Sequence, residues 1–440
     1  MKNINQNIFC NTPWYELNIY QDGRLGICCA EHHQLYDESE NDRYNIKNMS
    51  ISEWFNSKPV TDFRLAMLKN QKHSACTRCY HDEMFGYNSK RLDGFQKSAI
   101  FTQEAFIDSV EQSPGYSHFV YAAKNQGKTL TKPIDLHIDL GNHCNLACKM
   151  CNQEASSTIA LQNYKWGNKD AKRFIGTDWT RDQDVWSKFK NELLQIENLN
   201  NIHFMGGETL ISKQFEDFID TMIENKRFDL CFSFVSNGTI FNPILLEKLS
   251  KFRRVGFEIS IETIDEHNAY QRQGTNTESV LSNIQKYLSY CNGTSITVAL
   301  RPAPSLLSVG YYVPLLQYAL DNKLIVKSNL VYKPDFLSAS VLPADIKKMY
   351  AKEYKKFLKE LNDTNNNNQD FNPADPNNYR LSIKQQVLLV LNVLTSPAPA
   401  NSEELLQELV AHCKKWDNVY NYNARELYPE FAEILDCYGY

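Results

Sequence analysis

Three cysteines in a short segment carry the clearest chemistry in the sequence. Cys144, Cys148 and Cys151 are spaced C-x3-C-x2-C, and they follow residues 134–140, whose alternating apolar pattern predicts a β-strand. Structural zinc takes four protein ligands, and no His or Cys follows Cys151 closely enough to supply a fourth. Three thiolates can instead hold three irons of a 4Fe–4S cubane and leave the fourth iron open. We therefore expect such a cluster, with a zinc knuckle or three unrelated buried cysteines as the alternatives.

A second group of cysteines lies nearer the start of the chain. Two of them flank a hairpin, which is predicted by the alternating runs WYELNIY and RLGICC around Asp22-Gly23. The other two form a C-x2-C pair. Four such ligands could close around zinc or around an iron–sulfur cluster, and Cys29 could replace the member that it follows. The members of this group are Cys10, Cys28, Cys76 and Cys79.

The composition limits the class of protein. The chain has 440 residues, 42% of them apolar, and has room for two or three domains. A formal net charge of −5 gives no electrostatic case for a nucleic-acid partner. No apolar run approaches the ~20 residues of a membrane span, and the first residues show no signal-peptide pattern. We therefore expect a cytoplasmic protein with no membrane partner, in which the twelve cysteines do not form disulfides.

Strand and helix patterns alternate after the three-cysteine segment. This alternation predicts parallel β/α units, and six strands suit a partial (β/α)6 TIM-like barrel with its chemistry at the carboxyl ends of the strands. Amphipathic helical patterns then continue from residue 336 to the end of the chain. The predicted strands after the first are 201–208, 229–238, 254–262, 295–302 and 324–332, and the helices between them include 211–226, 244–252 and 279–291.

Polar motifs stand at the ends of three of these strands. Gly206-Gly207-Glu208 combines glycines, which let a ligand approach the backbone, with an acid that can accept from an ammonium group. Ser236-Asn237-Gly238 closes the next strand, and Ser260 and Arg272 lie at and after the one that follows. Each has a structural alternative: a tight turn with an exposed acid, an ordinary turn, and an arginine paired with Glu262 or Asp265.

Taken together, the cysteine spacing and Gly206-Gly207-Glu208 (the GGE element) resemble motifs of the radical S-adenosylmethionine (SAM) superfamily. The resemblance implies a 4Fe–4S cluster on Cys144, Cys148 and Cys151, whose open iron chelates the amino and carboxylate groups of SAM. It also implies cofactor-binding roles. Gly206, Gly207 and Glu208 would contact the methionyl amino group, Ser236 and Asn237 would lie near SAM or the substrate, and Ser260 and Arg272 would hold the ribose or carboxylate. Thr209 stands where the family usually has proline, and Glu262 where it has aspartate.

The N-terminal cysteines resemble a twitch domain, a shortened SPASM domain that carries an auxiliary 4Fe–4S cluster in radical SAM enzymes. Such domains usually follow the barrel, whereas this one precedes it. The expected organisation is a twitch-like domain over 1–95, a connector over 96–132, a radical SAM core over 133–335 and a helical region over 336–440.

The resemblance implies an enzyme whose reduced cluster cleaves SAM to a 5′-deoxyadenosyl radical, which abstracts hydrogen from a peptide, a protein or a small metabolite. A reductant such as flavodoxin or ferredoxin would supply the electron. The alternatives are a non-enzymatic iron–sulfur electron carrier and a zinc-stabilised binding module. The GGE element favours the enzyme, because neither alternative needs an acceptor for the amino group of SAM.

Overall fold

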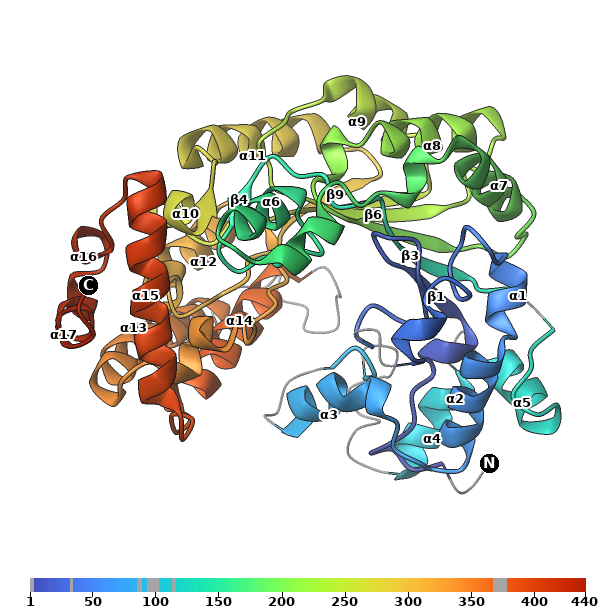
Figure 1. The fold of residues 1–440 in the computed structure, drawn as a ribbon, viewed down its shortest axis with the longest axis horizontal. Helices are drawn as coiled ribbons and strands as arrows, with labels where there is room; N and C mark the ends of the chain where they lie inside the picture. The colour runs from blue at the N-terminus through green and yellow to red at the C-terminus, as the bar shows by residue number, and fades with distance from the viewer. Residues whose placement is uncertain are drawn as a thin grey trace. The chain divides into compact units, whose positions relative to one another are not determined.

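The computed structural model describes residues 4–31, 35–84, 89–92, 103–112, 116–130, 132–366 and 378–440. Their strands form a mostly parallel eight-stranded sheet in the order β10-β9-β7-β6-β5-β3-β1-β2, and β4 and β8 form a separate two-stranded sheet (Figure 1). The predicted α/β class is confirmed. The chain divides into two compact units, of which the first comprises Met1–His143, Gln153–Phe234 and Glu247–Val255, and the second Cys144–Asn152, Val235–Leu246 and Gly256–Tyr440.

The strands are β1 (Glu16–Ile19), β2 (Leu25–Gly26), β3 (Asp135–Asp139), β4 (Ala147–Cys148), β5 (Asn201–Met205), β6 (Cys231–Ser236), β7 (Arg254–Ile259), β8 (Arg272–Gln273), β9 (Ile296–Leu300) and β10 (Ile325–Val326). The α-helices as far as β6 are α1 (Ile51–Phe55), α2 (Lys58–Leu68), α3 (Thr77–Met84), α4 (Gln103–Glu111), α5 (Tyr116–Lys124), α6 (Ser157–Lys165), α7 (Gln183–Leu194) and α8 (Lys213–Glu224). Those that follow are α9 (Pro243–Leu249), α10 (Glu266–Gln271), α11 (Thr277–Cys291), α12 (Tyr312–Asp321), α13 (Ala344–Asn366), α14 (Tyr379–Thr395), α15 (Ser402–Tyr420), α16 (Ala424–Leu427) and α17 (Ala432–Cys437).

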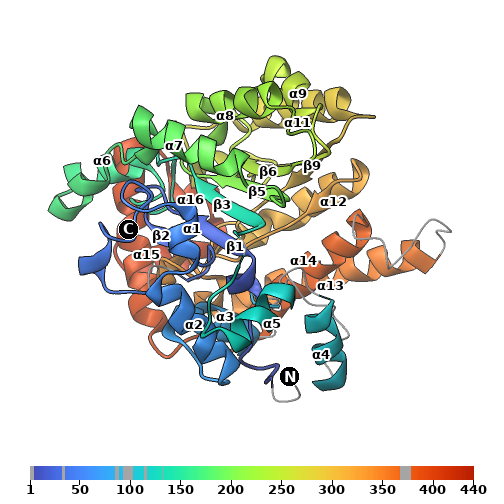
Figure 2. The same ribbon diagram turned by 90° about the vertical axis from the view of Figure 1, so that its right-hand side faces the viewer.

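In the first unit, alternate residues of β3 and β5 form an apolar layer. Ile138 and Phe204 are in register on neighbouring parallel strands, and both are fully buried. The Phe204 ring lies 5.1 Å from the rings of Phe215 and Phe218 on α8. Helices α7 and α8 cover this face of the strands (Figures 1 and 2). The two strand predictions 134–140 and 201–208 are thus confirmed, because their alternation matches burial on this face.

The N-terminal hairpin joins the edge of the same sheet. Its turn places Gly23 at φ +89°, a conformation that glycine adopts without strain, so the predicted hairpin is confirmed. The pairing of β1 was not expected from the sequence. β1 runs parallel to β3, with Asn18 opposite His137 and Ile19 opposite Ile138. The cysteine-bearing hairpin is therefore continuous with the strand that leads towards Cys144.

In the second unit, the strand predicted at 324–332 is short. Only Ile325–Val326 is a strand, although the chain continues beside residues 300–304. There the amide N–H groups of Asn329 and Val331 donate to the carbonyl oxygens of Pro302 and Pro304 at 3.1 and 3.0 Å. Because proline has no N–H to return, the reciprocal bonds cannot form and the ladder ends.

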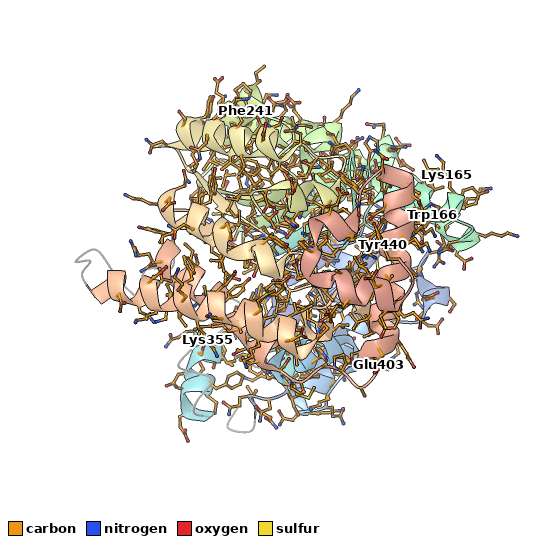
Figure 3. All side chains as sticks on the ribbon, turned by 90° about the vertical axis from the view of Figure 1, so that its left-hand side faces the viewer. Lys165, Trp166, Phe241, Lys355, Glu403 and Tyr440 are labelled. Carbon is orange, nitrogen blue, oxygen red and sulfur yellow. The ribbon has the colours of Figure 1, made fainter. Side chains whose placement is uncertain are left out.

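The last part of the second unit is helical, as predicted, over α13 to α17. One face of α15 is buried and includes Leu409 and Trp416. The C-terminal residue Tyr440 lies beside this helix, where its hydroxyl donates to the carboxylate of Asp417 (Figure 3). Within the described ranges, we find no helix with the length and apolar character needed to span a membrane.

Replacing Phe204 with alanine should lower the free energy of unfolding by about 3–5 kcal/mol, because the ring is fully buried among three other rings. Phe228→Ala is the matched control, since that ring is 38% exposed and should cost much less. Urea unfolding measures both. Equal losses for the two variants would contradict the packing described for β5.

Candidate functional site

The GGE element ends β5 with an unusually close backbone approach. Gly206 has φ +119°, and a Cβ atom there would lie 2.5 Å from the carbonyl oxygen of Gly141. At Gly207 it would lie 2.1 Å from the carbonyl oxygen of His143. Hydrogen bonds join the two segments, since Gly207 N–H donates to Gly141 O at 3.0 Å and Glu208 N–H to His143 O at 2.8 Å. The element therefore holds the residues directly before Cys144, and only glycine fits at both positions.

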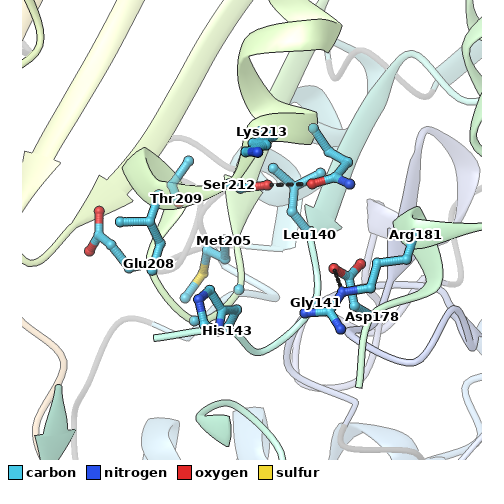
Figure 4. A pocket seen from close by; sticks show the side chains of 14 residues that line it. Leu140, Gly141, His143, Asp178, Arg181, Met205, Glu208, Thr209, Ser212 and Lys213 are labelled. Atoms are coloured by element: carbon cyan, nitrogen blue, oxygen red, sulfur yellow. Dashed lines mark hydrogen bonds and ion pairs between the residues drawn. The ribbon is translucent and has the colours of Figure 1, made fainter. Parts of the chain in front are cut away.

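Glu208 is not the exposed acid of an ordinary turn. Its side chain is 3% exposed, and its carboxylate accepts from the N–H of Leu210 at 3.0 Å. This bond caps the short 3-10 helix Thr209–Ile211 that precedes α8. Figure 4 shows the carboxylate directed away from His143 and from the Arg181–Asp178 pair. The predicted contact of Glu208 with the amino group of SAM stays a prediction.

The three-cysteine segment belongs to the second unit. The N–H of Cys151 donates to the carbonyl oxygen of Cys148 at 3.0 Å, and the antiparallel pair β4–β8 sets Cys148 opposite Arg272. Burial, followed by the charges of Cys148 and Cys144, raises the pKa of Cys151 to about 12. Cys148 is buried and Cys144 and Cys151 are partly exposed, and three neighbouring thiolates repel one another and need a positive centre to balance them. This donor set fits three irons of a cubane.

Arg272 places a positive charge beside this segment. Its guanidinium lies 3.7 Å from the sulfur of Cys148, and its Nε donates to the carboxylate of Glu262 at 2.9 Å. Glu262 is fully buried and also accepts from the N–H of Ala303. The arginine is thus engaged by Glu262, the alternative that the sequence raised. Its role in holding the ribose or carboxylate of SAM is still untested.

The Ser236-Asn237-Gly238 turn supports the same segment. Asn237 donates from its amide to the side-chain oxygen of Asn145 at 2.8 Å, one residue after Cys144. The Ser236 hydroxyl accepts from the N–H of Gly238 at 3.1 Å, and Ser260 N–H donates to the carbonyl oxygen of Ser236 at 2.8 Å. The structure therefore brings Ser236, Asn237 and Ser260 together in the second unit.

Lys149 is a residue that sequence reasoning missed. It lies between two of the cysteines, is 6% exposed, and donates from Nζ to the carbonyl oxygen of Tyr270. The ammonium group is 3.5 Å from the ring centre of Tyr270, 4.9 Å from that of Trp416 and 5.4 Å from that of Tyr422. Burial lowers the pKa of Lys149 to about 7. This aromatic cage attaches the three-cysteine segment to the C-terminal helices.

The four N-terminal cysteines line one cavity in the first unit, together with Lys90 and Arg91. Arg91 donates to the carbonyl oxygens of Gln6 and Phe9 at 2.6 and 2.7 Å and pairs with Glu83, which fixes the chain just before Cys10. Burial raises the pKa of Cys79 to about 11. Zinc would draw its sulfurs to about 2.3 Å from one point. Across the described ranges, no three His, Cys, Asp or Glu side chains are placed to hold a single ion. The same holds for Cys144, Cys148 and Cys151, so this absence does not distinguish zinc from a cubane, and both remain alternatives for the four cysteines around the cavity.

Cys29 has a different environment from Cys28. Cys28 lines the cavity, whereas Cys29 hydrogen-bonds to His137, whose Nε2 is 3.4 Å from Asp139 Oδ1. Burial opposes a charge on His137, but Cys29 and Asp139 outweigh it and raise the pKa of the imidazole to about 10. The structure therefore separates the two adjacent cysteines, which the sequence could not do.

Two family matches cover these regions. Residues 138–302 match the Radical SAM superfamily, and residues 10–80 match SPASM, an iron–sulfur cluster-binding domain. The first match includes the three-cysteine segment, the GGE element and Arg272, and the second includes all four N-terminal cysteines. A comparison with curated protein sequences gave no match.

Solved structures give remote similarities. Native anSMEcpe with bound AdoMet is 19% identical, with a TM-score of 0.38 over 53% of this chain and 60% of that one. Streptococcus suis SuiB bound to its precursor peptide SuiA is 13% identical, with a TM-score of 0.35 over 68% and 63%. TsrM from Kitasatospora setae, with cobalamin and a [4Fe-4S] cluster bound, is 12% identical, with a TM-score of 0.32 over 44% and 36%. The chain thus spans less than two thirds of the length of each.

Cys28→Ser should remove the N-terminal cluster, because Cys28 lines the cavity with the other three cysteines. Iron after anaerobic reconstitution should fall from about 8 to about 4 atoms per chain. Cys29→Ser is the matched control and should keep the full iron content, since Cys29 bonds to His137. Iron and sulfide analysis of both variants measures their cluster content and so shows which cysteine is the ligand. The opposite pattern would assign Cys29 as the ligand.

Gly207→Ala should destabilise the protein by about 1–3 kcal/mol and weaken SAM binding, because the added methyl group meets the backbone at His143. Gly167→Ala is the control, since no atom lies within 4 Å of a Cβ there and only the φ of +99° is unfavourable. Thermal unfolding and equilibrium dialysis with labelled SAM measure the two effects. Unchanged SAM affinity in Gly207→Ala would separate the GGE element from the SAM site.

Proposed function

Because this chain carries a radical SAM domain at 138–302 and a SPASM domain at 10–80, we propose that it is a radical SAM enzyme that acts on a second molecule. The cofactors are SAM, a 4Fe–4S cluster that binds it, and an auxiliary iron–sulfur cluster. Cys144, Cys148 and Cys151 would hold the first cluster, and Cys10, Cys28, Cys76 and Cys79 the second. When bound, the reduced first cluster supplies the electron that cleaves SAM to methionine and a 5′-deoxyadenosyl radical, which takes hydrogen from the second molecule.

The observation that carries this proposal is the three-cysteine segment together with the side chains that fix its position. The charges of Cys148 and Cys144 act on Cys151, and the Arg272 guanidinium lies 3.7 Å from the sulfur of Cys148. Asn237 and the cage around Lys149 fix the segment from two sides. An open ligand position in such a segment suits a chelating cofactor better than a closed structural metal.

The GGE element supports an enzyme over a simple electron carrier. The backbone N–H groups of Gly207 and Glu208 donate to the carbonyl oxygens of Gly141 and His143 just before Cys144, and Glu208 is buried at the same turn. An electron carrier requires no such arrangement next to its cluster.

The remaining parts of the proposal concern partners. A one-electron reductant such as flavodoxin or ferredoxin would reduce the first cluster, and the auxiliary cluster would relay electrons, bind substrate or brace the N-terminal region. SuiB binds a precursor peptide, and we keep a peptide beside a small metabolite as the substrate class. The cytosol is the proposed location.

The test is anaerobic reconstitution with iron and sulfide, followed by reduction in the presence of SAM. We expect about 8 iron atoms per chain and formation of 5′-deoxyadenosine. The triple variant Cys144→Ala, Cys148→Ala, Cys151→Ala should lose the deoxyadenosine and about half the iron. Cys291→Ala, which removes a buried cysteine of α11, is the matched control and should change neither. Undiminished deoxyadenosine from the triple variant would end the proposal.

A further inference from the structure

Two short helices lie in the chain between the three-cysteine segment and α7. They are α6 and the 3-10 helix Lys169–Phe174, both in the first unit, and we call residues 157–175 the basic segment. One side of this segment is packed, since Ile159 and Phe174 are buried. Lys165, which ends α6, belongs to the opposite, exposed side (Figure 3).

The basic segment is attached to the backbone just before the three cysteines. Asn142, two residues before Cys144, is fully buried. Its side-chain amide donates to the carbonyl oxygen of Phe174 at 2.6 Å, and its own carbonyl oxygen accepts from Ser157 N–H at 2.7 Å. Both helices of the segment are therefore bound to one residue next to the cysteines.

A second attachment lies just after the three cysteines. Gln153, two residues beyond Cys151, accepts through Oε1 from the side-chain amides of Asn163 and Asn168 at 3.2 and 3.3 Å. Two residues of chain span at most about 7 Å. The segment is thus held, at both of its attachments, a short stretch of backbone away from a cysteine predicted to bind the first cluster.

The exposed side of the basic segment is rich in large apolar side chains. Leu161 and Tyr164 are 40% and 41% exposed, and their spacing of three residues places them on one face of α6. Ile175, just after the 3-10 helix, is 39% exposed. Eleven large apolar side chains are exposed among all the described residues, and three of them belong to this one segment. Singly scattered apolar residues are ordinary on a protein surface, whereas such a concentration favours an interaction surface.

The same side is positively charged. Lys165, Lys169, Lys172 and Arg173 are all exposed, and the segment has a single carboxylate, Asp170, although the whole chain has a formal net charge of −5. Within the part of the chain that the structure describes, none of these four cations forms an ion pair.

The acids on either side of the segment in the sequence are already engaged. Glu154 lies 4.0 Å from Arg24, and Asp178 pairs with Arg181 at 3.2 Å. The carboxylate of Asp182 caps α7 and accepts from its first amide N–H groups. The positive charge of the basic segment is therefore complementary to an acidic partner.

The openness of this surface favours a protein that carries electrons over an acidic substrate. A substrate must meet the radical in a site that excludes water, whereas these side chains face solvent. An electron carrier needs only a short path to the cluster, and electron-transfer complexes have small interfaces. The attachments through Asn142 and Gln153 provide such a path, since Asn163 adjoins Tyr164 on α6.

We propose that the basic segment is the docking surface for an acidic one-electron carrier protein, the reductant of the first cluster. The exposed cations steer and orient the carrier, and Leu161, Tyr164 and Ile175 form the apolar centre of the contact. One electron passes from the carrier, which is oxidised, to the cluster, which is reduced, and no bond forms between the two proteins. This assignment rests on the proposed function, because it names the surface that receives the reductant.

The test measures binding of an acidic flavodoxin to the reconstituted holoprotein by calorimetry at low salt. The double variant Lys165→Glu, Lys169→Glu should weaken binding at least about tenfold, because two attractive charges become repulsive. Tyr164→Ala should also weaken binding, and Lys165→Arg, Lys169→Arg should retain it. Lys128→Glu, Lys251→Glu is the matched control, since it reverses two other exposed lysines of the first unit and should bind as wild type does. Unchanged melting temperatures show that the variants fold.

The rate of 5′-deoxyadenosine formation separates docking from the later chemistry. With reduced flavodoxin at low concentration as the electron source, Lys165→Glu, Lys169→Glu should be at least about tenfold slower than wild type. Dithionite is a small ion that needs no docking surface, so with dithionite the two proteins should be equally fast.

Each other result overturns the proposal in a recognisable way. Equal flavodoxin binding by wild type and the Lys165, Lys169 reversal, or no binding to the wild type, would mean no docking surface here. An equal loss in the Lys128, Lys251 control would mean attraction by net charge alone. A wild type that binds an octaglutamate peptide but no flavodoxin would assign the segment to an acidic peptide. The expected binding pattern in a protein that forms no 5′-deoxyadenosine with either reductant would keep the docking surface and refute the proposed function.

Discussion

At Gly206 and Gly207 the backbone after β5 runs against the backbone of Gly141 and His143, at distances that leave no room for a side chain. Two hydrogen bonds join the segments, so the residues that follow β5 and those that follow β3 are fixed against each other. Cys144 follows His143 directly in the chain. The approach therefore sets the point from which the three-cysteine segment departs.

Besides this backbone approach, the three-cysteine segment depends on the charges near its thiols. Buried thiols resist ionisation, yet only thiolates bind iron, so a positive charge near the cysteines favours the cluster. Arg272 supplies such a charge, and its own charge is balanced by the buried Glu262, whereas Lys149 lies among aromatic rings where burial lowers its pKa to about 7. Trp416 and Tyr422 of that cage come from the C-terminal region, so these helices do more than cover a core.

Local pattern predicted much of the architecture. The strands ending near residues 139, 205 and 236 follow from apolar alternation, and the GGE glycines from the need for close approach. The strand at 324–332 was overestimated, because its neighbour presents Pro302 and Pro304, whose effect depends on pairing rather than on the strand's own residues. Contacts between distant residues, such as those of Lys149 with Trp416 and of Cys29 with His137, leave no local signal.

Because β1 pairs in parallel with β3, removing the N-terminal region would also remove a strand of the sheet. Parallel neighbours cannot be joined by a tight turn, so the chain between β1 and β3 forms a long crossover that carries the C-x2-C pair. Without β1, the strand β3 would become an open sheet edge with unpaired N–H and C=O groups, a template for aggregation. The cysteine-bearing hairpin thus also serves as edge protection. A truncated chain that began just before β3 would sacrifice solubility along with the auxiliary cluster.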